Sequence, residues 1–203
     1  MWKELGIILA LVLFMFAISR LGRRRNDDSR SAKLMKQYKT LTPELLADTA
    51  DDELVEAIVA HVLAKASEAR KPNPGFTLSK MPQPYTVVYS IWAVCKELAH
   101  GDYAALTRTA TRDMVEHACD GLPVIGATAT AAALKAVVEA YRGDEDTAEA
   151  EHAFHTAVES ECPLHLCVLY IRDHVAELMG EEPVEEESVD APAEPVEETT
   201  DGE

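Results

Sequence analysis

The chain has 203 residues, which is enough for one domain with extensions, and acidic residues outnumber basic ones by 36 to 19. A formal net charge of −17 repels nucleic acid and anionic lipid, so direct nucleic-acid binding is not expected. The four cysteines do not form the dense framework of a small secreted domain, so we expect reduced thiols in a helical core. They are Cys95, Cys119, Cys162 and Cys167.

The charge is unevenly distributed along the chain. Residues 1–40 hold nine basic and three acidic residues, and residues 41–179 hold ten and 22. Residues 180–203 hold 11 acidic residues and no basic one. This order predicts a basic segment, an acidic domain and a more acidic tail, for which a basic or DNA-binding protein is a better partner than DNA itself.

The first element is an unbroken apolar run of 14 residues, Leu5 to Ile18. A helix that spans a bilayer needs about 20 residues. Trp2 at one edge and Arg20 at the other extend the usable length, because both residue types lie at the interface. We predict an uncleaved transmembrane anchor over residues 1–21, with membrane contact through residues 2–21. A cleaved signal peptide is the alternative, but no small-residue cleavage site precedes Arg20.

The residues after this run predict its orientation. Arg20, Arg23, Arg24 and Arg25 follow it directly, and the positive-inside rule keeps such a flank in the cytoplasm. We therefore expect a single-pass protein of the inner cell membrane, with its N-terminus outside and its domain in the cytoplasm. Residues 22–41 are polar and basic, which is typical of a juxtamembrane linker.

Residues 42–179 show helical periodicity, and no run alternates like a strand. The most apolar helix opens near Pro84 and closes at Gly101, so we expect it at the centre. The sequence predicts an all-α bundle of about six helices, with turns at "RKPNPGF" and "DGLPVIGAT". The expected helices cover residues 51–69, 84–100, 103–119, 128–142, 144–161 and 163–179, with Thr128 or Thr130 as the cap of the fourth.

The composition changes sharply at Gly180. Residues 180–203 have no basic or aromatic side chain and three prolines. Such a segment cannot bury enough apolar surface to offset the entropy of ordering, so we expect a disordered acidic tail.

Two stretches, "MPQPYTVVYSIWAVCKELAHGDY" and "CDGLPVIGATATAAALKAVVEAY", resemble the bacterial DNA-mimic-protein-like domain family. The resemblance rests on Pro84, Val88, Trp92, Glu97, Gly126 and Ala127. It implies an all-α fold without known catalysis, and it suggests mimicry of DNA. The family's Asn-Gly-Gly-Phe loop corresponds here to His100, Gly101, Asp102 and Tyr103, which keep one glycine and the aromatic residue.

Two clusters of acidic residues mark predicted helix starts. Such carboxylates either cap and solubilise the helices or form a rigid negative surface for a basic partner. We take them as candidate interaction residues. The first cluster is Asp48, Asp51, Asp52, Glu53 and Glu56, and the second is Asp144, Glu145, Asp146, Glu149 and Glu151.

A metal site is a weaker alternative. His152 and His155 share a helix face, and Cys162, His165 and Cys167 follow, so zinc bound by both cysteines and one histidine is conceivable. The short C-x-x-C knuckle is missing, and "GLPVIGAT" lacks the Lys-Ser/Thr of a phosphate loop. We therefore predict no enzyme, no cofactor and no metal.

These patterns favour a membrane-anchored cytoplasmic module that recruits a protein, with an acidic surface for a basic partner. A membrane-tethered enzyme or metal-binding domain is one alternative. A structural subunit of an envelope complex, bound to membrane proteins through residues 1–25, is another.

Overall fold

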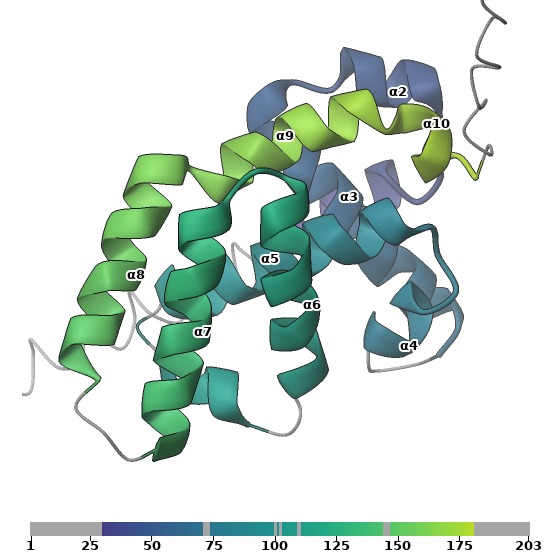
Figure 1. Cartoon of the computed structure of the whole chain (residues 1–203). Coiled ribbons are helices and arrows are strands. Elements are labelled where there is room, and N and C mark those ends of the chain that lie inside the picture. The colour runs from purple at the N-terminus through teal and green to yellow at the C-terminus, as the bar shows by residue number, and fades with distance from the viewer. Residues whose placement is uncertain are drawn as a thin grey trace, which may run out of the picture.

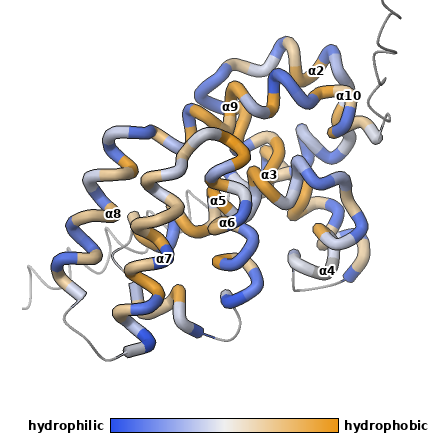
Figure 2. Tube along the Cα trace, in the orientation of Figure 1, coloured by the Kyte–Doolittle hydropathy of each residue, from blue (hydrophilic) through white to orange (hydrophobic). Residues whose placement is uncertain are grey.

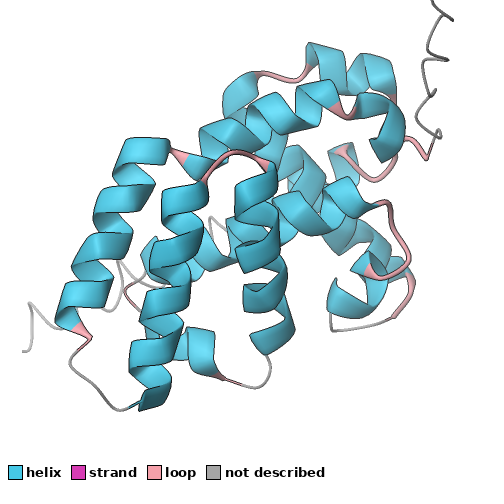
Figure 3. Ribbon diagram, viewed as in Figure 1, coloured by secondary structure: helices cyan, strands magenta, loops and turns pink. Residues whose placement is uncertain are grey.

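The computed structural model describes residues 30–70, 74–99, 101, 103–108, 111–143 and 147–180. All regular structure in these ranges is helical (Figure 3), which confirms the all-α prediction. The predicted anchor over residues 1–21 and the predicted tail from residue 181 lie outside them. Across the described ranges, every helix is too short or too polar to cross a bilayer.

The described ranges contain nine labelled α-helices and one 3₁₀-helix. A further helical stretch covers residues 30–37. The labelled elements are α2 (Pro43–Asp48), α3 (Asp51–Glu68), α4 (Pro74–Leu78), α5 (Gln83–Ala99), η1 (Tyr103–Thr107), α6 (Arg112–Val124), α7 (Thr128–Gly143), α8 (Ala148–Glu161), α9 (Pro163–Asp173) and α10 (Val175–Leu178).

Helix α5 is the centre of the domain, as its apolar sequence predicted. It contacts α3, α6, α9, α10 and η1. Val88 and Ile91 are fully buried, and Tyr85 donates a hydrogen bond from its hydroxyl to the carbonyl of Leu178 on α10. Apolar segments of α3, α5 and α9 meet in the middle of the molecule (Figure 2). The core is therefore built around one helix rather than around a symmetric bundle.

The remaining helices form two groups around α5 (Figure 1). Helices α6, α7 and α8 lie side by side as one layer, with α7 in contact with both neighbours. Helix α9 crosses over α3 and α5 near α2 and α10 in the other group. The surface between α3, α5 and α9 is thus formed by segments that are far apart in the sequence.

The domain begins earlier than the predicted boundary at residue 42. Tyr38 is buried to 1% exposure, and Leu41 is also buried. The ring of His61 on α3 donates from Nδ1 to the carbonyl of Tyr38, at 2.9 Å. The expected linker therefore packs against the domain from residue 30 onward, because its apolar side chains recur at helical spacing among the lysines.

The predicted turn "DGLPVIGAT" is shorter than expected, because Gly121, Leu122 and Pro123 belong to α6. A Cβ on Gly121 would lie 3.3 Å from Cγ1 of Val87, so glycine permits the close approach of α6 to α5. The chain turns instead at Gly126, which adopts φ +89°.

The estimate of about six helices was too low, because breaks fall where the pattern looked continuous. His174 separates α9 from α10, and its ring donates from Nδ1 to the carbonyl of Tyr170 at 2.8 Å. The predicted helix over residues 103–119 is divided into η1 and α6. Pro74 begins the short helix α4, where the sequence suggested only a break.

Candidate protein-interaction groove

The candidate site is a groove made of two hollows along one face of α3, and α5, α9 and the 30–37 helix complete it. Trp92 on α5 and Glu56 on α3 line both of its halves, which have volumes of about 400 Å³ and 350 Å³. We call it the Trp92 groove. Its first half is lined by Asp51, Asp52, Val55, Glu56, Trp92, Leu164, His165 and Val168. Its second half is lined by Arg30, Ser31, Leu34, Glu56, Val59, Ala60, Leu63, Trp92 and Lys96.

The first half combines an apolar wall with acidic side chains. Leu164 on α9 is 41% exposed and forms part of this wall. Asp51 and Asp52 lie in the first turn of α3, and the Asp51 carboxylate is held by Arg172 at 2.8 Å. This half therefore suits a ligand that has both apolar and cationic groups.

The second half has cationic side chains above an apolar wall. Arg30 Nη2 lies 2.6 Å from Glu56 Oε2, and both side chains are exposed. Lys96 Nζ lies 4.7 Å from the centre of the Trp92 ring, within range of a cation–π interaction. Glu56 and the Trp92 side chain thus belong to both halves.

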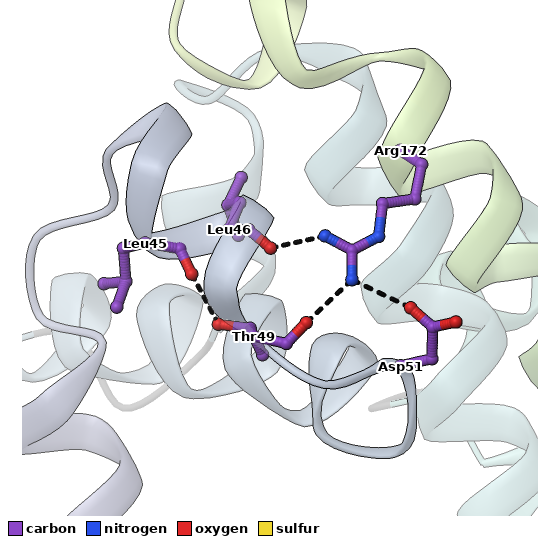
Figure 4. Close-up of polar contacts among 5 residues, drawn as sticks. All are labelled: Leu45, Leu46, Thr49, Asp51 and Arg172. Atoms are coloured by element: carbon purple, nitrogen blue, oxygen red, sulfur yellow. Dashed lines mark hydrogen bonds and ion pairs between the residues drawn. The ribbon is translucent and has the colours of Figure 1, made fainter.

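Arg172 on α9 fixes the start of α3 beside the groove (Figure 4). Its guanidinium donates to the carbonyls of Leu46 and Thr49, which end α2, and to the carboxylate of Asp51 at 2.8 Å. The Thr49 hydroxyl in turn donates to the carbonyl of Leu45. One side chain thus joins α2, α3 and α9, and it compensates part of the charge of Asp51.

The first predicted acidic cluster is only partly assembled into this site. Asp51, Asp52 and Glu56 line the groove. Asp48 is exposed at the end of α2, and Glu53 is half-buried on α3, and neither lines the groove. Asp52 has no ion-pair partner among the described residues, so its charge is available to a ligand.

The second predicted acidic cluster has a different environment. Asp144, Glu145 and Asp146 lie outside the described residues. Glu149 is exposed in the first turn of α8. Glu151 accepts hydrogen bonds from the hydroxyls of Tyr141, at 2.6 Å, and of Thr147, at 2.8 Å. Glu151 therefore connects α8 to α7 through Tyr141, and it also binds Thr147, the residue that precedes α8.

The loop that resembles a family motif contributes to packing in the part that is described. His100 and Asp102 lie outside the described residues, and Gly101 adopts φ +73° after α5. Tyr103 is buried, its ring stacks on Tyr141 at 6.3 Å between centroids, and a hydrogen bond of 2.6 Å joins its hydroxyl to Nε2 of His155. Tyr103 thus connects η1 to α7 and α8.

The structure does not bring the considered zinc ligands together. Cys162 is exposed at the left-handed turn between α8 and α9, whereas Cys167 is fully buried. Burial raises the pKa of Cys167 to about 12 and that of Cys95 to about 11, which keeps both thiols protonated. His152 and His165 are exposed, and His155 bonds to Tyr103. Within the described ranges, no three metal-binding side chains converge.

The start of α7 is capped from another helix, whereas the sequence predicted a cap by Thr128 or Thr130. Glu161, the last residue of α8, accepts from the backbone N–H groups of Ala129 and Thr130 and from the Thr130 hydroxyl. Partial burial acts to raise the pKa of Glu161, but these three hydrogen bonds outweigh it and lower the pKa. A cap supplied from 31 residues away has no local signal in the sequence.

Comparison with known proteins adds no relative: no family model matches the chain, and no curated protein or solved structure does either. The resemblance to the DNA-mimic-protein-like domain therefore stays a prediction.

Proposed function

We propose that this protein is a membrane-tethered interaction module that binds a basic segment of another protein in the Trp92 groove. The observation that supports it best is that an indole, an exposed leucine and three carboxylates line one hollow. Tryptophan is enriched among the residues that contribute most to binding. Carboxylates beside it select a cationic partner and accelerate association.

The apolar part of the groove provides affinity, and the charged part provides selectivity. Burial of apolar surface contributes about 25 cal/mol per Å² before the costs of association are subtracted. Exposed charge pairs contribute little each, but like charges brought together are unfavourable. A basic segment with apolar side chains matches both the apolar part and the acidic part of the groove, whereas an acidic segment is repelled by Asp52.

The tether is part of the proposal. The apolar run before Ile18 and the arginines after it support a single span with the domain on the cytoplasmic side. A tethered module meets its partner at the inner face of the membrane, where the tether raises the effective concentration of any partner that is also membrane-bound.

Mimicry of DNA is a narrower version of this function, and it rests on the family resemblance. It requires an array of available carboxylates that replace phosphates. In the first cluster Asp51 is paired with Arg172 and Glu56 with Arg30, so a peptide in the groove is favoured over a mimic of the duplex.

Affinity capture with matched variants tests the proposal. The full-length protein in detergent serves as bait beside its Leu164→Glu and Leu169→Glu variants. Both leucines are exposed on α9, at 41% and 49%, but only Leu164 lines the groove. We expect a basic protein to be captured by the wild type and by Leu169→Glu, to be lost from Leu164→Glu, and to be released by salt. Equal capture by both variants would contradict the proposal.

A further inference from the structure

A separate pocket lies beside α5, and α4, η1 and α6 complete its lining. None of its lining residues lines the Trp92 groove. We call it the Tyr89 pocket. We infer that it binds a small aromatic amine that carries a hydroxyl group at the end opposite its ammonium group. This inference goes beyond the proposed function and does not depend on it.

The size of the Tyr89 pocket limits its ligand to about one ring. Its volume is about 170 Å³, and each half of the Trp92 groove has more than twice that volume. A protein cavity of about 150 Å³ holds one benzene ring. The Tyr89 pocket is therefore suited to a small molecule rather than to a helix of a partner protein.

The walls of the pocket are mainly apolar. Val94 on α5, Leu106 on η1 and Val115 on α6 are buried in the core, which gives the walls a defined shape. Met114 is half-buried and lines the pocket beside them. A methionine sulfur makes favourable contacts with aromatic rings, so this wall favours an aromatic body in the ligand.

Tyr89 provides a polar group within this apolar lining. Its side chain is 7% exposed, and in the part of the chain that the structure describes its hydroxyl has no hydrogen-bond partner. A buried tyrosine usually bonds its hydroxyl to a partner. Burial raises the pKa of Tyr89, so the hydroxyl stays protonated and can both donate and accept. A hydroxyl group of the ligand supplies the missing partner.

Glu97 provides the second polar group of the pocket. It lines the pocket, is exposed, and has no ion-pair partner among the residues that the structure describes. Tyr89 and Glu97 lie on the same helix about 12 Å apart along its axis. A ligand that satisfies both therefore has polar groups at its two ends, and the carboxylate of Glu97 selects a cation for one of them.

Methyl NMR on the full-length protein in zwitterionic nanodiscs tests this inference. The methyl groups of the six methionines are labelled with ¹³C, and Met114→Leu assigns the signal of Met114. The probes are tyramine, tyrosol, which has a hydroxyl in place of the ammonium group, and phenethylamine, which lacks the phenol hydroxyl. We expect tyramine to shift the Met114 signal with a dissociation constant of about 1 mM, which is reasonable for about ten non-hydrogen atoms. Tyrosol and phenethylamine should each bind about fivefold more weakly.

Conservative variants identify the two polar contacts. Glu97→Gln should weaken tyramine about fivefold and leave tyrosol unchanged, because only tyramine carries the ammonium group. The matched control is Asp113→Asn, since Asp113 is the exposed neighbour of Met114 and does not line the pocket. Tyr89→Phe keeps the ring, so it should weaken tyramine and tyrosol and leave phenethylamine unchanged.

Each contrary outcome overturns a defined part of the inference. If none of the three probes shifts the Met114 signal, the pocket does not bind such molecules. If tyrosol binds as tightly as tyramine, or if Glu97→Gln and Asp113→Asn have equal effects, the assignment of an amine is wrong. If Tyr89→Phe leaves tyramine binding unchanged, the assignment of the ligand hydroxyl is wrong. The proposed function is tested separately through Leu164→Glu, which lies outside this pocket.

Discussion

The starts of α3 and α8 look alike in the sequence and differ in the fold. Each is a helix N-terminus rich in carboxylates, where negative charge is stabilised by the helix dipole. At α8, Glu151 is bound by two hydroxyls and joins neighbouring helices. At α3, Asp52 lines an open groove together with Trp92. The comparison indicates that an acidic helix start becomes a candidate binding surface only where packing leaves apolar side chains uncovered beside it.

This comparison predicts that the two helix starts respond differently to substitution. Changes at the start of α8 alter the stability of the fold, whereas changes at the start of α3 alter binding and leave stability nearly constant. The exception at α3 is Asp51 with its partner Arg172, which belongs to the framework of the groove.

The largest effect is expected for Arg172→Met. This change removes the guanidinium donor from the carbonyls of Leu46 and Thr49, of which Leu46 keeps the Thr49 N–H, and it leaves Asp51 without its partner. An unsatisfied buried polar group costs about 1–3 kcal/mol, so we expect a loss of about 3 kcal/mol in the free energy of unfolding, measured with urea. The control is Arg112→Met, which removes only an exposed pair with Glu116 and leaves stability nearly unchanged. Equal effects of the two changes would show that Arg172 does not hold the framework.

Reversal of the charge of Asp52 tests whether the start of α3 binds a partner. Asp52→Lys places a cation where the ligand's own cation is expected, so affinity for the captured partner should fall about tenfold or more. Glu149→Lys makes the same change of charge at the start of α8, and we expect it to leave affinity for the partner nearly constant. Isothermal titration on the two variants checks this. A larger loss for Glu149→Lys would reverse the assignment of the two clusters.

Removal of the Glu151 carboxylate tests whether the start of α8 stabilises the fold. Glu151→Ala removes the carboxylate that accepts from the hydroxyls of Tyr141 and Thr147, and we expect a loss of about 1 kcal/mol in the free energy of unfolding. Asp52→Ala should change stability by less than this, because Asp52 is exposed and unpaired among the described residues. Parallel urea titrations measure both. The account of Glu151 is wrong if Glu151→Ala is as stable as the wild type.

The smallest effect concerns the cap of α7. The pKa of Glu161 is lower in the folded protein than its usual value of 4.5, so the unfolded chain binds this proton more tightly. The contribution of Glu161 is therefore complete above pH 4.5 and is lost as the pH falls toward the folded pKa. Glu161→Gln should flatten the dependence of the melting temperature on pH below 4.5, whereas Glu159→Gln, an exposed neighbour on α8, should not. Identical slopes for wild type and Glu161→Gln would contradict this.

The sequence predicted the helical class and most of the apolar stripes, because 3.6-residue periodicity is a local property. The stripe of Leu54, Ile58 and Val62 on α3 is buried as expected. The Trp92 groove was not predicted. Trp92, Leu164 and Arg30 come from three segments, and their proximity depends on how α9 crosses α3 and α5. The cap from Glu161 to Thr130 and the network of Arg172 were missed for the same reason.

Photocrosslinking in the native host tests the central claim most directly. A benzoylphenylalanine at position 164 points a reactive group into the Trp92 groove, and the same residue at position 169 lies on α9 outside it. We predict that position 164 crosslinks to one protein through a segment with lysines or arginines beside apolar residues, and that position 169 does not. Crosslinking from position 169 alone, or to the same protein from both positions, would contradict the groove as the binding site.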